Sequence, residues 1–320
     1  MATPQSTREE EEAAALHALT SQYRQLVPPQ TLHFPPPHLL SQEHFQDAIY
    51  HALFSPSTSP DTIPPQRYTA RVLKALVAEI EASNPDEINS SLLSLYSTFP
   101  SSSAPPPTSR VPVTYTLPAP YPSITLHETP SLISGLGTTG LRTWEAALAL
   151  SEYLLLHPPH GQRVLELGAG TGVVALVAAR CGAEDVLATD GDEGVCDVLR
   201  ENVGRNGLGG RVRVEQRQWG GKRDVPEDVQ LVVGADVTYD AEAILWLVAE
   251  LSFLLQENRE CKVIIAATIR NEDTFQVFRD SCAEAKLALV ESVYTLPEPR
   301  VFWYVPRAEI RLVEVSMMEK

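Results

Sequence analysis

The chain has 320 residues, of which 43% are hydrophobic, and it carries a formal net charge of −16 at pH 7. That length and apolar content allow one large core or two modest ones. The acidic balance disfavours nucleic acid, which is bound by clustered lysine and arginine side chains, and favours a protein partner with a basic surface.

The N-terminal stretch "MATPQSTREEEEAAALHAL" is acidic, whereas a signal or transit peptide would be basic. No apolar run in the chain approaches the roughly 20 residues that a membrane helix needs. We therefore expect a cytoplasmic protein that has no membrane partner.

Residues 1 to about 96 give mostly helical patterns. In the segment 69–82, apolar side chains recur at helical spacing at Val72, Leu73, Leu76 and Ile80. The prolines of segment 25–40 interrupt these patterns, because a helix interior does not tolerate proline.

Segment 97–123 is rich in proline and serine, which is typical of a linker or an extended wrap. We place a domain boundary at its end. Residues 1–122 then form a mostly helical accessory region, for which we expect a role in substrate recognition, and residues 123–320 form a second domain.

The second domain begins with a predicted helix over 141–156, introduced by Thr138 or Thr139 as its cap. Beyond Gln162, short apolar runs alternate with helical ones, which predicts a parallel sheet covered on both faces. Helical segments are expected between the first six strands, whereas proline-rich residues 295–308 favour a hairpin and an antiparallel last strand. The seven predicted strands are 164–167, 186–189, 212–215, 231–235, 262–268, 287–294 and 310–316.

The stretch "VLELGAGTG", residues 164–172, reads as a buried strand followed by a glycine turn, with a helix starting at about Val173. Glycines allow a ligand to approach the backbone closely, although such a turn also serves strand-to-helix packing alone. Because Val173 stands where a dinucleotide fingerprint has its third glycine, a pyrophosphate fits poorly. Asp190 ends the second strand, where a carboxylate accepts both ribose hydroxyls, so the pattern predicts a nucleoside-like ligand.

With these two motifs, residues 126–320 resemble the seven-strand S-adenosylmethionine-dependent methyltransferases. The stretches "GTTGLRTWEAALAL" (137–150), "QWG" (218–220) and "ADVTYD" (235–240) are similar to the branch of protein lysine methyltransferases that has an acid-x-x-Tyr motif. The resemblance implies an α/β fold with a Rossmann-like seven-strand sheet and S-adenosylmethionine as the cofactor.

By the same resemblance, Asp236 and Tyr239 stand at the substrate side, where we expect the acid to accept a hydrogen bond from the lysine amine and the tyrosine to orient it. The alternatives are a loop cap for Asp236 and core packing for the tryptophans. The residues expected to line the cofactor pocket are Trp144, Glu166, Gly168, Ala169, Gly170, Asp190, Trp219 and Ala235.

The N-terminal extension, with "YRQL" at residues 23–26 and the helix around Leu73, is similar to the subgroup that modifies translation elongation factor 2. The resemblance implies a protein-lysine N-methyltransferase acting on that factor, and we expect this enzyme to be a monomer. A methyltransferase of nucleic acid would carry Asn/Asp-Pro-Pro-aromatic after the fourth strand, where this chain has "DVTY". A methyltransferase of another protein is a further alternative, as is a non-catalytic module, although the glycine turn and the ribose acid are intact.

The remaining metal-ligand residue types predict no metal site. Cys181, Cys196, Cys261 and Cys282 form no CxxC and are expected as reduced, packed thiols. The histidines of "HPPH", residues 157–160, are separated by prolines and have no matching carboxylate or thiol nearby, so we expect a solvated turn there.

Overall fold

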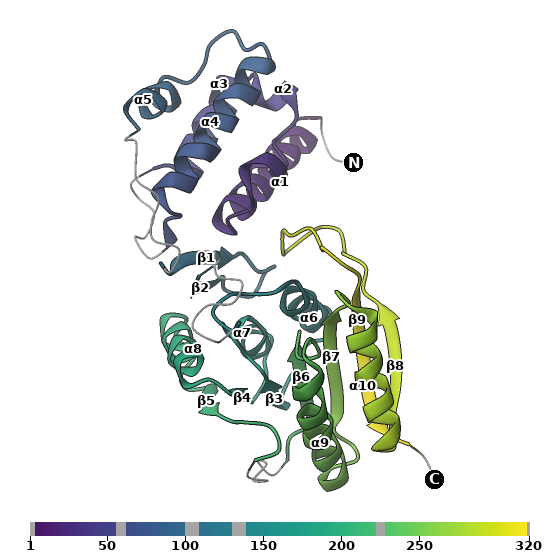
Figure 1. Ribbon diagram of the computed structural model, residues 1–320. Helices are drawn as coiled ribbons and strands as arrows, with labels where there is room; N and C mark the ends of the chain where they lie inside the picture. The colour runs from purple at the N-terminus through teal and green to yellow at the C-terminus, as the bar shows by residue number, and fades with distance from the viewer. Residues whose placement is uncertain (1–3, 56–61, 100–108, 130–138, 222–227, 319–320) are drawn as a thin grey trace. The chain divides into compact units, whose positions relative to one another are not determined.

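The computed structural model describes residues 4–55, 62–99, 109–129, 139–221 and 228–318. The chain forms two compact units, Met1–Thr116 and Leu117–Lys320, which Figure 1 colours from purple to blue and from teal to yellow. The break between them falls inside the proline- and serine-rich segment 97–123.

The described part of the first unit is helical apart from one strand at its end. The elements are α1 (Pro4–Arg24), a 3-10 turn η1 (Pro29–Thr31), α2 (Pro37–Leu40), α3 (Glu43–Leu53), α4 (Gln66–Ala82), α5 (Ser90–Thr98) and β1 (Val111–Tyr115). The prolines of segment 25–40 lie in the short helices η1 and α2 and just before them, where a missing backbone N–H leaves no helix bond unmade.

The core of the first unit confirms the helical spacing read from segment 69–82. Val72, Leu73, Leu76 and Ile80 all lie on the buried face of α4. Tyr23 of α1 is also buried; its hydroxyl lies 2.8 Å from Oγ1 of Thr69, and its ring stacks on Tyr68. The tyrosine of the "YRQL" stretch therefore joins α1 to α4.

The second unit contains a seven-stranded sheet in the order β5-β4-β3-β6-β7-β9-β8. Its strands are β3 (Arg163–Leu167), β4 (Asp185–Asp190), β5 (Val212–Gln216), β6 (Leu231–Ala235), β7 (Lys262–Thr268), β8 (Leu287–Val293) and β9 (Ile310–Met317), preceded by β2 (Ile124–Glu128). Its helices are α6 (Glu145–Leu156), α7 (Val173–Arg180), α8 (Glu193–Arg205), α9 (Ala241–Glu257) and α10 (Glu272–Glu284).

Strand direction in this sheet follows the sequence prediction. The strands β3 to β7 pair in parallel, whereas β9 runs antiparallel to both β7 and β8. The predicted hairpin and antiparallel last strand are thus confirmed. All seven predicted strands are present, and their ends agree within two residues.

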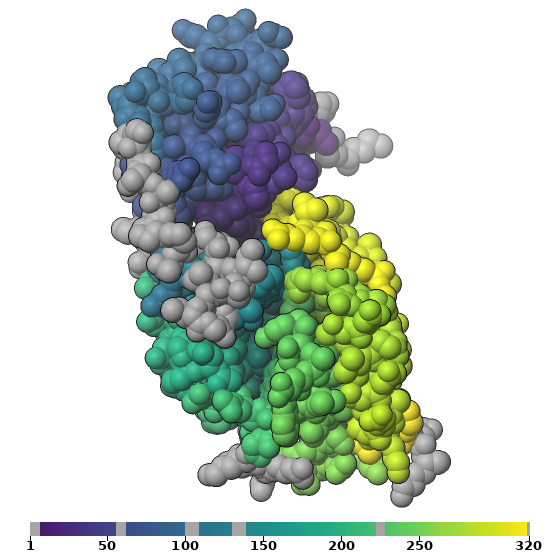
Figure 2. All heavy atoms as spheres, viewed as in Figure 1, coloured from purple at the N-terminus to yellow at the C-terminus, as the bar shows by residue number. Residues whose placement is uncertain are grey.

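Helices cover both faces of the sheet, so both sets of alternating strand side chains are buried. On one face Leu165, Val232 and Ile265 pack against α9 and α10, which lie side by side in Figures 1 and 2. The opposite face lies under α6 and α7, and there Glu166 accepts a hydrogen bond from the backbone N–H of Ala175. A strand buried on both faces explains the unbroken apolar runs.

One local prediction was wrong, and a second is not borne out in the described residues. Thr139 does not cap the helix, because α6 begins only after Trp144, whose backbone is extended. The N–H of Thr143, just before Trp144, donates to Oε2 of Glu128. Thr138 lies outside the described residues. Between β5 and β6, the described residues contain no helix. That connection includes adjacent glycines, Gly220 and Gly221, which disfavour a helix.

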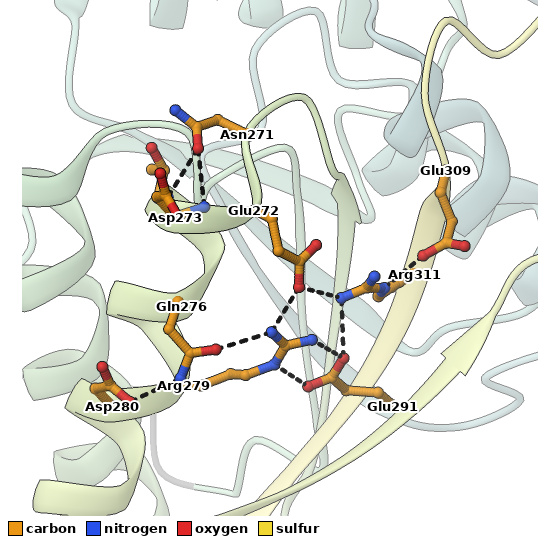
Figure 3. A network of polar contacts seen from close by, with 10 residues as sticks. Asn271, Glu272, Asp273, Gln276, Arg279, Asp280, Glu291, Glu309 and Arg311 are labelled. Atoms are coloured by element: carbon orange, nitrogen blue, oxygen red, sulfur yellow. Dashed lines mark hydrogen bonds and ion pairs between the residues drawn. The ribbon is translucent and has the colours of Figure 1, made fainter.

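A polar network fastens α10 to the end strands of the sheet (Figure 3). Arg279 of α10 makes two hydrogen bonds to Glu291 of β8, at 2.7 and 2.8 Å, and one to Glu272. Arg311 of β9 contacts the same two carboxylates, and both guanidinium groups lie over the ring of Phe275. The network covers the apolar edge of this helix–sheet contact.

The four cysteines are buried, as predicted, and carry free thiols. Burial raises the pKa of the Cys181 and Cys261 thiols to about 11. Within the described residues, no helix combines the length and apolar character needed to cross a membrane.

Candidate active site

The candidate site lies where the connections of the sheet change direction. Strand β3 pairs with β4 on one side and with β6 on the other. The chain therefore leaves the carboxyl end of β3 toward one side of the sheet and that of β6 toward the other. In open α/β sheets a ligand binds at such a point, in the crevice outside the carboxyl ends of the strands. The predicted residues follow these strand ends.

The glycine turn after β3 has a backbone that side chains disfavour. Gly168 and Gly170 have φ angles of +68° and +54°. A Cβ atom on Gly170 would lie 3.3 Å from the carbonyl oxygen of Gly140, so that the turn and the 139–144 segment approach each other at backbone level. Ala169 between them is buried and donates its N–H to the carbonyl of Thr189.

Asp190, at the end of β4, is bonded to this turn. Its Oδ2 accepts the N–H of Gly170 at 3.0 Å, and its Oδ1 accepts the N–H of Asp192 at 3.1 Å. Burial raises the pKa of this carboxyl, and these backbone hydrogen bonds oppose the shift. The backbone N–H of Gly191 also acts on this carboxylate. A carboxylate has about four acceptor positions, so these three donors leave one for a ribose hydroxyl.

Glu166 lies beneath the turn with 2% of its surface exposed. Burial raises the pKa of its carboxyl to about 8, helped by the nearby charge of Asp190 and opposed by the hydrogen bond from Ala175. Among the described residues, its Oε2 has no hydrogen-bond partner. A buried polar atom without a partner is costly in a protein core, which marks this position as one that fits a polar ligand group or a water.

Two half-buried tryptophans flank the crevice. Trp219 follows β5, and its ring lies 3.6 Å from the position that a Cβ on Gly168 would occupy. Trp144 precedes α6 and donates its indole N–H to the carbonyl of Thr139 at 3.1 Å. Ala235, the last residue of β6, is half-buried at the same edge. Glycine turn, ribose acid and aromatic walls together fit an adenosine-containing cofactor.

The two residues of the acid-x-x-Tyr motif differ in their surroundings. Asp236 has a left-handed backbone (φ 52°), and only 7% of its side-chain surface is exposed. Tyr239 is 60% exposed, and its hydroxyl accepts a hydrogen bond from Oγ1 of Thr139 at 3.4 Å. The loop after β6 thus turns the acid inward and the tyrosine outward.

All four acceptor positions of the Asp236 carboxylate are engaged. Oδ1 accepts the N–H of Thr268 at 2.9 Å and Nη1 of Arg270 at 3.4 Å, while Oδ2 accepts Oγ1 of Thr268 at 3.1 Å and Nη2 of Arg270 at 3.2 Å. Burial raises the pKa of this carboxyl, and the charge of Arg270 works against the shift.

Sequence reasoning missed three residues of this region. Arg270 and Glu145 form an ion pair at 3.0 Å, and Gly140 faces the glycine turn. Gly140 and Glu145 lie within the stretch 137–150, in which the sequence pattern predicts only Trp144 as a site residue. Arg270 stands two residues after a predicted strand, where a charged side chain is ordinary.

Comparison with known proteins places these features in context. The family described as lysine methyltransferase matches residues 132–281. The chain is 37% identical over 306 residues to the protein-lysine N-methyltransferase EFM3 of Chaetomium thermophilum, covering 86% of this chain and 89% of that protein. It is 33% identical over 219 residues to the human protein-lysine N-methyltransferase EEF2KMT, covering 61% and 64%.

Solved structures show more distant likeness. A methyltransferase from Pyrococcus furiosus superimposes with a TM-score of 0.42 at 21% identity, over 58% of this chain and 86% of that one.

Proposed function

We propose that this chain, which belongs to the family of protein-lysine N-methyltransferases, methylates a lysine side chain of translation elongation factor 2. Membership of the family makes it an S-adenosylmethionine-dependent enzyme. The likeness to EFM3 spans more of the chain than residues 117–320 supply, which supports a shared first unit. The likeness to EEF2KMT, which acts on elongation factor 2, supports the same substrate.

The cofactor pocket that we propose is built from the residues around the glycine turn. Asp190 takes a ribose hydroxyl, and the backbone of Gly168, Ala169 and Gly170 allows close approach. Glu166 lies below the turn with its unpaired oxygen. Trp144, Trp219 and Ala235 supply the walls.

Methyl transfer requires the protein mainly to align the lysine amine with the methyl group. S-adenosylmethionine supplies a methyl group already activated on a sulfonium. The lysine amine, with an ordinary pKa of about 10.4, must lose its proton to solvent before its nitrogen lone pair forms the new bond to carbon. The methyl–sulfur bond would break as the nitrogen–carbon bond forms, and its electron pair would stay on sulfur. The protein must therefore aim the amine at the methyl carbon, opposite the sulfur, and exclude water from the site.

We assign this aiming to Asp236 and Tyr239. The exposed Tyr239 meets the incoming side chain first, and its ring tolerates the cationic forms of the product. The negative charge of Asp236 attracts the ammonium. A direct bond between Asp236 and the amine requires one contact of Arg270 to open, and the contact from Nη1, at 3.4 Å, is the longest.

The first unit has no nucleotide motif, and we assign it to recognition of the protein substrate. Its described part is a small helical body with its own buried core. The net charge of −16 supports a basic surface on the substrate, because opposite charges raise encounter rates. We place the enzyme in the cytoplasm as a monomer.

The test is methylation in cytosolic extract with labelled S-adenosylmethionine, followed by mass spectrometry of the labelled band. We expect one lysine of elongation factor 2 to carry the label. Label on another protein would overturn the substrate and keep the lysine methyltransferase, whereas label on RNA would contradict the assignment of a protein substrate.

A further inference from the structure

Arg270 connects the acid-x-x-Tyr segment to the start of α6. It follows β7, and its guanidinium contacts Asp236 through both Nη atoms, at 3.2 and 3.4 Å. The same Nη2 donates to Glu145 of α6 at 3.0 Å. Its Cζ lies 4.9 Å from the ring centroid of Trp144. One side chain thus touches residues on both the substrate side and the cofactor side of the site.

The carboxylates that share Arg270 are both buried. The side chain of Asp236 is 7% exposed and that of Glu145 is 10% exposed, whereas that of Arg270 is 38% exposed. Asp236 depends on this guanidinium most, because Glu145 also lies 3.8 Å from Arg307, and removing one partner of a buried ion pair leaves charge buried without compensation. The planar fork of an arginine also fixes the angle between its partners, which a lysine does not do.

We propose that Arg270 is a positioning residue for methyl transfer, which holds the Asp236 carboxylate and the Trp144 indole in one arrangement. This rests on the roles proposed above for these two residues. Arg270 acts through them and is not itself assigned a contact with the substrate.

The charges around Asp236 decide what the removal of Arg270 will do to this carboxylate. Arg270 faces Asp236 from the β7–α10 segment, and Tyr239 follows it in its own loop. Glu145 of α6 is connected to Asp236 through Arg270, which contacts both carboxylates. Arg307 of the β8–β9 segment contacts Glu145. Replacing Arg270 removes the one cation bonded to Asp236 in the described structure. Burial then raises the pKa of this carboxyl further, opposed by the hydrogen bonds from Thr268.

The experiment compares Arg270→Met, Arg270→Lys and Arg307→Met. Arg307 is the matched control. It is an arginine that lies 3.8 Å from the same Glu145, but 69% of its side chain is exposed and, among the residues that the structure describes, it does not bond to Asp236. For Arg270→Met we expect kcat at pH 7 to fall about ten-fold, because the Asp236 carboxylate and the Trp144 indole lose their common anchor and the amine is aimed less well. The acid limb of the kcat profile should move to higher pH, with KM for the protein substrate unchanged. Arg270→Lys should recover part of kcat, and Arg307→Met should stay within about two-fold of wild type.

A double-mutant cycle separates positioning from general damage to the fold. If Arg270 acts through Asp236, the loss of kcat in the variant carrying both Arg270→Met and Asp236→Asn will be smaller than the two single losses combined, and the two changes will also couple in the free energy of urea unfolding. Additive losses would overturn the proposal. So would a loss in Arg270→Met that is equal at every pH, or an equal loss in Arg307→Met.

The outcome is distinguishable from failure of the proposed substrate. Activities are measured on the protein that the wild-type enzyme labels in cytosolic extract, whether or not it is elongation factor 2. The unfolding cycle needs no substrate at all, so it supports or overturns the coupling between Arg270 and Asp236 in either case.

Discussion

The backbone N–H of Gly170 donates a hydrogen bond to Oδ2 of Asp190 at 3.0 Å, so the glycine turn after β3 and the acid at the end of β4 form one bonded unit. A change in either residue therefore disturbs both the turn and the acceptor meant for the ribose. The first two predictions concern this unit.

Replacing Gly170 by valine is expected to lower cofactor affinity at least ten-fold. The residue has a φ of +54°, which costs an L-residue about 1–2 kcal/mol and a β-branched one more, and its Cβ would press on the carbonyl of Gly140. Equilibrium binding of S-adenosylmethionine measures the effect. Gly209→Val is the control, because nothing lies within 4 Å of a Cβ there. Wild-type affinity in the Gly170 variant would place the cofactor elsewhere.

Replacing Asp190 by alanine is expected to weaken cofactor binding by about 1.5–3 kcal/mol, the range for hydrogen bonds to a charged group. The loss combines the ribose contact with the bond that steadies Gly170. Titration calorimetry at pH 7 measures it, beside Asp197→Ala, which removes an exposed carboxylate of α8. An unchanged dissociation constant for Asp190→Ala would mean that the ribose binds to another group.

Replacing Glu166 by glutamine is expected to flatten the dependence of stability on pH. Its carboxyl has a folded-state pKa of about 8, whereas an unfolded glutamate titrates at about 4.3. Between these values the native state holds a proton that the unfolded state has lost, so the wild-type protein loses stability as the pH rises through this window. Urea unfolding at pH 5.5, 7 and 8.5 should show a smaller decline in the variant. Equal declines would contradict the raised pKa.

A fragment of residues 117–320 is expected to bind S-adenosylmethionine with wild-type affinity but to lose methylation of the protein substrate. All the residues proposed for the cofactor lie in this unit, whereas the proposed recognition region is removed. Cofactor binding is the internal control for folding of the fragment. Undiminished methylation would show that the first unit is dispensable for recognition.

The strands and the strand-end residues were predictable from sequence, whereas long-range polar contacts were not. The run of β7 (Lys262–Thr268) is apolar between its polar end residues, because both faces of the sheet are covered, and this apolar run indicates the limits of the strand. The start of α6 was misplaced because the N–H of Thr143 bonds to Glu128, a partner 15 residues earlier. Arg270 was missed for the same reason, since its importance arises from Glu145, which is 125 residues away in the chain.

Replacing Tyr239 is expected to lower turnover without changing stability or cofactor binding. Its ring is 60% exposed and its hydroxyl has a single long contact with Thr139, so Tyr239→Phe should leave the free energy of unfolding and the cofactor dissociation constant unchanged. Loss of one neutral hydrogen bond, about 0.5–1.5 kcal/mol, predicts a fall in kcat of about two- to ten-fold. Tyr239→Ala should lose more, because the ring that faces the ammonium is also removed.

Steady-state rates with the protein substrate at saturating S-adenosylmethionine measure these losses. Leu156→Ala, which trims another exposed side chain of the same unit at the end of α6, is the matched control. The order wild type, Tyr239→Phe, Tyr239→Ala in decreasing kcat supports an orienting role for both the hydroxyl and the ring. If Tyr239→Ala turns over as fast as Leu156→Ala, the tyrosine does not meet the substrate lysine, and the amine is aimed from the Asp236 side alone.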